Sequence, residues 1–247
     1  MIPVARMLRN SLPFLVVETG QPIPSMRRHG RFSHWIRTAA GLARGEVESV
    51  DVQSAGPPSV RGYAGVVVSG SGAMVSDREP WSERTADWLR DAAHAGVPVF
   101  GICYGHQLLA HALGGEVADN PHGIEMGTID VTLLPQSNDD PLFVGLPARI
   151  KAQASHMQAV LRLPAGAELL ATSALDPWHA FRWGESSWGV QFHPEFSAGH
   201  MRGYIEARGD ILRRGGQDPA ALEAAVRAAP DARRVLRRFV RRARRHA

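Results

Sequence analysis

The fold is decided by one segment, which reads Val97-Pro98-Val99-Phe100-Gly101-Ile102-Cys103-Tyr104-Gly105-His106-Gln107. Its first half is apolar and β-branched, as is typical of a buried strand, and its second half begins a helical pattern that ends at Gly114-Gly115. Cys103 therefore lies at a strand-to-helix corner. The glycines on either side of this corner permit the sharp turn that presents a nucleophile at the end of a strand.

Outward from this corner, the first half of the chain alternates strands and helices. Strands are expected at 12–19, 47–53, 65–69 and 97–102, with helical spacing of apolar residues around 32–39 and 86–93. Alternation of this kind predicts a parallel sheet that is covered on both faces.

The second half shows a different pattern. Strands are expected at 128–134, 149–153, 168–172, 180–183 and 188–192, with turns such as 135–140 and no long helix between them. From residue 197 onward the composition is helical again, with breaks near 215–216 and at Pro230. We predict a three-layer α/β sandwich whose mostly parallel central sheet carries an antiparallel extension. Residues 1–247 are expected to form a single domain, with a core at about 12–197 and a basic helical extension at about 198–247.

Composition narrows the class of protein. A chain of 247 residues with 44% hydrophobic content can bury one large core. No apolar stretch approaches the roughly 18 residues of a membrane helix. The apolar run 12–17 is cut by Glu18 and is too short for a secretory signal, so we expect a cytoplasmic protein with no membrane partner. The single cysteine, Cys103, excludes an internal disulfide and is a candidate nucleophile.

The C-terminal segment 233–247 holds eight of the 28 Lys and Arg residues and no acid, which leaves 20 bases against 24 acids elsewhere. Its apolar residues Val235, Leu236, Phe239 and Val240 have helical spacing. One interpretation is a terminal helix docked on the body with a solvated basic face. The other is contact with nucleic acid, anionic lipid or an acidic subunit. Because no recognition motif or aromatic interleaving accompanies the charge, we predict no nucleic-acid partner.

Cys103 has two interpretations. Free cysteine is often a small buried hydrophobe. A cysteine at a helix N-terminus, however, lies near the positive end of the helix dipole, and such sites have thiol pKa values lowered to roughly 3.5–7.5. The glycine-flanked corner favours the nucleophile.

A general base is expected in the segment Trp188-Gly189-Val190-Gln191-Phe192-His193-Pro194-Glu195-Phe196. In an extended backbone His193 and Glu195 project to the same face, so the carboxylate can orient the imidazole. His193 would then exchange protons with Cys103 and with a leaving group. The histidines lack metal-ligand spacing and thiolate hydrolysis needs no metal, so we predict neither a metal nor a cofactor.

A strand and small-residue turn at 65–73 can aim backbone N–H groups at an oxyanion, together with the N–H of Tyr104. Taken alone, this Ser-Gly-Ser-Gly sequence is more often an ordinary turn.

At these residues the chain resembles the class I glutamine amidotransferases, specifically stand-alone proteins similar to the amidotransferase domain of GMP synthase. The segments G-I-C-Y-G-H-Q and G-V-Q-F-H-P-E-F carry the resemblance, which runs from about residue 12 to about residue 197. It implies a flavodoxin-like sheet and a triad of Cys103, His193 and Glu195 that forms a γ-glutamyl thioester and releases ammonia. It also implies an oxyanion hole from the backbone of Ser71 and Tyr104.

The resemblance also implies substrate-binding residues. The family glutamine four residues after the nucleophile corresponds to Gln107, whose alternative role is an ordinary polar residue on a helix surface. Segment 154–160 looks like the family's S-H-G-D-x-V stretch, which assigns Ser155, Met157 and Gln158 to the substrate. Met157 and Gln158 replace the usual Gly and Asp, and Ser71 stands where glycine is common. These departures leave open whether the donor is glutamine or another γ-glutamyl compound.

Three functions follow from the sequence. The first is a glutaminase that supplies ammonia to a separate synthetase subunit, since the chain has no G-x-x-x-x-G-K-[ST] loop and too little length for a synthetase module. The second is a stand-alone hydrolase of γ-glutamyl compounds. The third is a non-enzymatic binding protein that retained the fold, against which the intact Cys, His and Glu argue.

Overall fold

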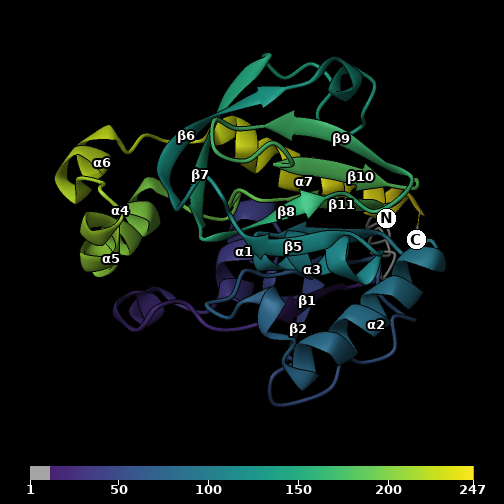
Figure 1. The fold of residues 1–247 in the computed structure, drawn as a ribbon. Coiled ribbons are helices and arrows are strands. Elements are labelled where there is room, and N and C mark those ends of the chain that lie inside the picture. Colours follow the sequence, from purple (N-terminus) through teal and green to yellow (C-terminus); the bar gives the residue numbers. More distant parts are fainter. Residues whose placement is uncertain (1–11, 247) are drawn as a thin grey trace, which may run out of the picture.

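The computed structural model describes residues 12–246, and its framework is a nine-stranded sheet in two halves of opposite pairing (Figure 1). The parallel half runs in the order β2 (Val47–Asp51), β1 (Phe14–Glu18), β3 (Gly65–Val68), β4 (Val99–Ile102) and β11 (Ser187–Val190). The antiparallel half continues with β10 (Ala180–Trp183), β9 (Ala167–Thr172), β6 (Glu125–Leu133) and β7 (Arg149–His156). The predicted fold class is therefore confirmed.

A second, two-stranded antiparallel sheet joins β5 (Glu116–Asp119) to β8 (Gln158–Arg162). The sequence analysis did not predict these strands. The connections also contain four short 3₁₀ helices, η1 (Pro24–His29), η2 (Arg44–Glu46), η3 (Val75–Asp77) and η4 (Pro135–Asn138).

Helices cover both faces of the sheet and close two apolar cores. One core contains residues of α1 (Phe32–Ala40) and α7 (Pro230–His246), and the other contains residues of α2 (Pro80–His94) and α3 (Tyr104–Ala112). The buried residues of α1 are those at helical spacing, and the helix ends at Gly41, whose φ of 75° suits glycine. Among residues 12–246, no helix combines the length and the apolar character needed to cross a bilayer.

The C-terminal region forms four helices. The first three, α4 (Ala198–Ala207), α5 (Gly209–Arg214) and α6 (Pro219–Ala225), gather beyond β6 and β7 in Figure 1. In α7 the predicted apolar stripe is buried, with Val235, Leu236 and Phe239 fully so, and its arginines occupy the other faces. This packing fits the docked-helix interpretation. Residues 1–11 and 247 of the predicted single domain lie outside the described residues.

The topology brings three strand ends together. β4 pairs in parallel with β3 on one side and β11 on the other. Because the carboxyl ends of parallel strands meet at one edge of a sheet, the residues that follow β3, β4 and β11 become neighbours there.

Candidate active site

Cys103 lies at the corner between β4 and α3 in a strained conformation. Its φ of 52° and ψ of −103° make it one of two described non-glycine residues with positive φ. Such a conformation costs on the order of 1–3 kcal/mol and is held only where surrounding packing enforces it. Here the Cys103 amide donates to Val190 O (2.9 Å), and a methyl group on Gly105 would approach Val68 O to 2.6 Å. Glycine at that position lets α3 pack against β3.

His193 is buried and held on several sides. Its Nδ1 lies 2.8 Å from Glu195 Oε1, its backbone N–H donates to Gln153 O (2.8 Å), and its ring stacks on Phe196 at 4.1 Å between centroids. Both His193 and Glu195 are less than 5% exposed. The hydrogen bond to the carboxylate places the Nδ1 proton on that side, which leaves Nε2 for Cys103.

The electrostatics favour charge separation between Cys103 and His193. Burial raises the pKa of the Cys103 thiol, but the positive charge and hydrogen bond of His193 outweigh it and bring the net pKa below its ordinary value. Burial lowers the pKa of His193, while the negative charges of Glu195 and Cys103 outweigh it and raise the pKa to about 10. Both shifts act in the same sense, because they favour a thiolate on Cys103 and an imidazolium on His193.

The turn after β3 lies against the Cys103–His193 pair. A methyl group on Gly70 would meet His193 Cε1 at 2.9 Å and Cys103 Cβ at 3.8 Å. Ser71 follows, with its hydroxyl donating to Thr19 O (2.7 Å) and accepting from the Ala73 amide (3.1 Å). Its own side chain thus fixes this turn at the rim of the pocket.

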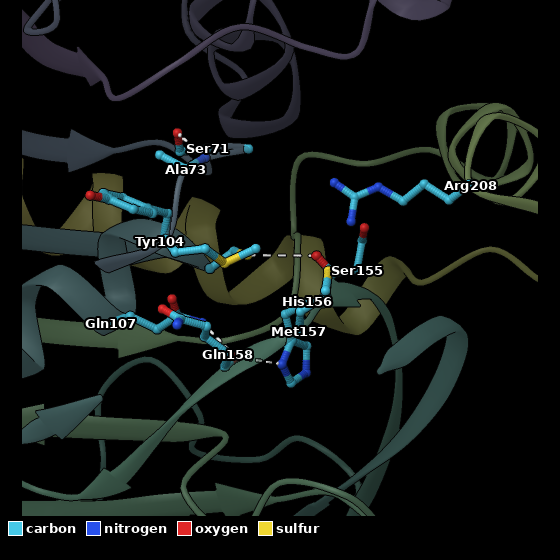
Figure 2. Close-up of a pocket in the computed structure, with 12 residues that line it drawn as sticks. Ser71, Ala73, Tyr104, Gln107, Ser155, His156, Met157, Gln158 and Arg208 are labelled. Atoms are coloured by element: carbon cyan, nitrogen blue, oxygen red, sulfur yellow. Dashed lines mark hydrogen bonds between the residues drawn. The ribbon is translucent and has the colours of Figure 1, made fainter. Parts of the chain in front are cut away.

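The two predicted oxyanion donors border the same pocket as Cys103. Ser71 and Tyr104 both line it (Figure 2). Tyr104 is the first residue of α3, where a backbone N–H has no intrahelical acceptor.

The predicted substrate-binding residues also line this pocket, but some of their polar atoms are already hydrogen-bonded within the protein and others are not. Ser155 contributes its carbonyl oxygen 3.9 Å from Cys103 Sγ, and its own Oγ is buried without a partner. Gln107 Nε2 donates to Gln158 O (2.7 Å) and to Gln191 Oε1 (3.0 Å), so its amide nitrogen is used in holding the pocket wall. Met157 lines the pocket without a polar group.

Gln158 turns its side chain into the wall rather than the pocket centre. Its Nε2 donates to Ser76 Oγ (2.6 Å) and Asp119 Oδ1 (3.0 Å), and its Oε1 accepts from the Ser76 amide (3.4 Å). Both ends of the amide are therefore occupied by neighbouring protein groups.

Arg208, at the junction of α4 and α5, is a pocket residue that the sequence analysis missed. It borders the hollow beside Cys103 and a second hollow beside His193. Figure 2 shows its guanidinium directed towards Ser155. No motif marks this residue, which lies among ordinary helical arginines; only the packing of α4 and α5 brings it to the pocket.

A buried polar cluster supports the end of β7, which carries Ser155. His156 Nδ1 donates to Gln158 O (2.9 Å) and its Nε2 lies 2.9 Å from Glu125 Oε2, while Glu125 Oε1 accepts from Ser173 Oγ (2.6 Å). Glu125, His156 and His179 could together offer ligand atoms to a metal. Glu125 and His156, however, already hydrogen-bond each other, so we interpret the cluster as a structural support for β6 and for the end of β7 that borders the pocket.

Comparison with known proteins gives a family match. The family model described as "Glutamine amidotransferase class-I" matches residues 28–209. GMP synthase [glutamine-hydrolyzing] of Aeropyrum pernix is 44% identical over 133 residues, which are 53% of this chain and 24% of that protein. A GMP synthase [glutamine-hydrolyzing] subunit of Archaeoglobus fulgidus is 33% identical over 186 residues, which are 72% of this chain and 93% of that relative.

The match to full-length GMP synthases is partial, since the chain spans about a quarter of the length of those relatives. Among solved structures, a glutamine amidotransferase of Thermotoga maritima superposes with a TM-score of 0.74 at 22% identity, covering 94% of this chain and 98% of that one. At this identity the likeness supports the fold.

Proposed function

Because this chain belongs to the class I glutamine amidotransferase family, we propose that it is a glutamine amidohydrolase in which Cys103, His193 and Glu195 act as a catalytic triad. The observation that carries the proposal is the buried arrangement of Cys103, His193 and Glu195, in which Glu195 Oε1 lies 2.8 Å from His193 Nδ1. The pKa shifts of Cys103 and His193 favour the same roles. A nucleophile, a base and an orienting group in this order are the parts that acyl transfer requires.

In the first half of the proposed reaction, the Cys103 thiolate attacks the γ-carbonyl carbon of the substrate. The backbone amides of Ser71 and Tyr104 would stabilise the resulting oxyanion. As the tetrahedral intermediate collapses, the C–N bond breaks and His193 gives its proton to the departing nitrogen. The products of this step are ammonia and a γ-glutamyl thioester on Cys103.

In the second half, His193 takes a proton from water, which attacks the thioester carbonyl. Collapse of this second intermediate breaks the C–S bond and regenerates the thiolate with glutamate as product. Glu195 keeps the imidazole in one tautomer throughout and stabilises its charged form.

The fate of the ammonia is a separate part of the proposal. One of the relatives is named as a subunit of a glutamine-hydrolysing GMP synthase, and it matches this chain over most of its length. We propose on this ground that the chain passes ammonia to a separate synthetase subunit.

A stand-alone γ-glutamyl hydrolase is the second candidate, and one feature of the pocket favours it. Gln158 and Met157 offer the substrate no charged group, and both ends of the Gln158 amide are taken by Ser76 and Asp119. The pocket thus differs from one built for the zwitterionic end of free glutamine.

The test is release of glutamate from glutamine and from a panel of γ-glutamyl compounds by the purified protein. We expect release to vanish in Cys103→Ala and His193→Ala, and to persist in His94→Ala, whose histidine is exposed on α2. Release from glutamine only when a synthetase is present would support the ammonia-supplying role. Steady release in isolation would support the stand-alone hydrolase. No release under either condition, with Cys103 inert to a glutamine-like alkylating analogue, would contradict the amidohydrolase.

A further inference from the structure

We propose that Arg208 binds the carboxylate of the substrate and that the pocket needs no free α-ammonium group, so that it accepts γ-carboxamides whose amino group is acylated or missing. This inference rests on the proposed function and names its substrate class. Arg208 borders the hollows on both the Cys103 and the His193 side, and these hollows also share Ser71, Gly72 and Ser155. A group held by Arg208 therefore lies beside the place where the γ-amide must sit.

Arg208 is available for a ligand. Among residues 12–246 its guanidinium makes no hydrogen bond and no ion pair; it only approaches the ring of Tyr204, at 5.9 Å from the centroid. Arg213 of α5, by contrast, is already paired with Asp210 (2.8 Å). A guanidinium fork matches a carboxylate in two parallel hydrogen bonds. The Ser155 Oγ, buried and without a partner on the same pocket wall, offers a further donor.

Among the described residues, the lining of the pocket offers no carboxylate partner for an ammonium group. None of the described residues that line either hollow is Asp or Glu. Glu195, the acid of the proposed triad, accepts a hydrogen bond from His193. It borders a different hollow, which His29 and His200 also line. The amide of Gln158 is held by Ser76 and Asp119. Apart from the Cys103 thiol, the charged side chain that the two hollows share is the Arg208 guanidinium, a cation, so an ammonium group would find no carboxylate to pair with there.

Two simple amides separate the two halves of glutamine recognition. Glutaramate keeps the carboxylate and the γ-amide but has no amino group, whereas 4-aminobutanamide keeps the amino group and the amide but has no carboxylate. With ammonia release as the readout, we expect kcat/KM for glutaramate and N-acetylglutamine to be within about tenfold of that for glutamine. Turnover of 4-aminobutanamide should be lower by about 10- to 100-fold or more, as expected for loss of hydrogen bonds to a charged group.

The variants locate the effect at Arg208. Arg208→Met should raise KM for glutaramate by about 10- to 100-fold and leave the turnover of 4-aminobutanamide unchanged. Arg208→Lys should recover part of the loss with glutaramate. Arg202→Met is the matched control, because Arg202 is exposed on the adjacent helix α4 and lines neither hollow, so its loss should leave KM unchanged. Equal losses for both amides in Arg208→Met, or rejection of both glutaramate and N-acetylglutamine by the wild type, would overturn the proposal.

A binding readout keeps this test independent of turnover. Cys103 is the single cysteine of the chain, so intact-mass spectrometry reports its alkylation by iodoacetamide directly. Glutaramate should protect Cys103 in the wild type and in Arg202→Met but not in Arg208→Met, while 4-aminobutanamide should protect in none. If glutaramate protects Cys103 and 4-aminobutanamide does not, but no ammonia is released, carboxylate binding by Arg208 would stand and the hydrolase function would be refuted. Protection that ignores Arg208 would refute the inference alone.

Discussion

At Cys103, burial and the neighbouring imidazole act on the thiol in opposite directions, and the imidazole prevails. The net pKa of the thiol lies below its ordinary value, and that of His193 rises to about 10. A thiolate exists above its own pKa, so a lowered pKa keeps the sulfur reactive at pH values where an ordinary thiol is protonated.

This balance predicts the pH dependence of alkylation. In the wild type, the rate of Cys103 alkylation by iodoacetamide should hold its plateau to a lower pH than an ordinary thiol does, and fall as the pH drops through the lowered pKa. In His193→Ala, the largest influence that opposes burial is lost, so the midpoint should move up to or beyond that of an ordinary thiol. Rates measured by mass spectrometry between pH 5 and about 10.5 decide the matter. Coinciding profiles would mean that His193 does not hold the thiolate.

Gly70 allows a second prediction at the scale of one residue. Its missing side chain makes room for His193, because a methyl group there would lie 2.9 Å from His193 Cε1. Gly70→Ala should displace the imidazole and lower kcat for glutamate release by about 100-fold or more, since small misplacements of catalytic groups cost this much. Gly45→Ala, where a methyl group meets nothing within 4 Å, is the control and should keep full activity. Full activity in Gly70→Ala would show that the imidazole is not confined as described.

The sequence predicted some of these residues and not others, for a physical reason. Cys103, His193 and Glu195 lie within short segments whose local geometry sets their neighbours. Arg208 reaches the pocket only through the packing of distant helices, a relation that no local spacing records. The roles assigned to all of these residues, the triad included, remain predictions.

At the scale of elements, the hydrogen bond between Glu125 and His156 ties β6 to the end of β7 that borders the pocket. Both side chains are less than 5% exposed. Burial disfavours the charge on each side chain, but the hydrogen bond and the opposite charge of its partner outweigh burial. The pKa of Glu125 is therefore lowered from 4.5, and that of His156 is raised from 6.5. The stability from Glu125 is present above pH 4.5 and lost as pH falls through its folded pKa. The stability from His156 is present below pH 6.5 and lost as pH rises through its folded pKa.

We therefore expect the pair to stabilise the fold most between about pH 4.5 and 6.5. Glu125→Gln should lower the free energy of unfolding by on the order of 3 kcal/mol in this window, and by less on either side of it. Glu116→Gln is the control, because Glu116 faces Arg162 in an exposed pair (3.7 Å) and should matter by less than about 1 kcal/mol. Urea unfolding from pH 4 to about 9 measures both. A constant difference across this range would argue against an ion pair.

Prediction of elements succeeded where periodicity was strong. Strand Ala180–Trp183 was predicted with its observed bounds, and the helices around Trp35 and Leu89 are present. β5 and β8 were missed because each has only four or five residues of mixed burial, and each becomes a strand through pairing with a segment about 40 residues away. Such pairing is a property of the folded chain.

At the scale of the whole molecule, the C-terminal region is tied to the structural framework of the site. Phe239 of α7 is fully buried and lies 5.1 Å from Phe100 of β4 and 6.2 Å from Trp188 of β11, centroid to centroid. These two strands lead to Cys103 and towards His193. The predicted division into a core at about 12–197 and an extension stays a prediction, and the packing of α7 supplies a way to test how separable the extension is.

If α7 belongs to the cooperative unit, Phe239→Ala should lower the free energy of unfolding by about 3–5 kcal/mol, because it leaves a cavity against both strands. Ile211→Ala, in the same C-terminal region but 37% exposed, should cost less than about 1 kcal/mol. Urea unfolding followed by tryptophan fluorescence and by the rate of Cys103 alkylation should give one shared transition for each variant, displaced strongly only in Phe239→Ala. A Phe239→Ala protein in which the site stays protected after α7 has detached would instead define an extension that folds apart from the catalytic core.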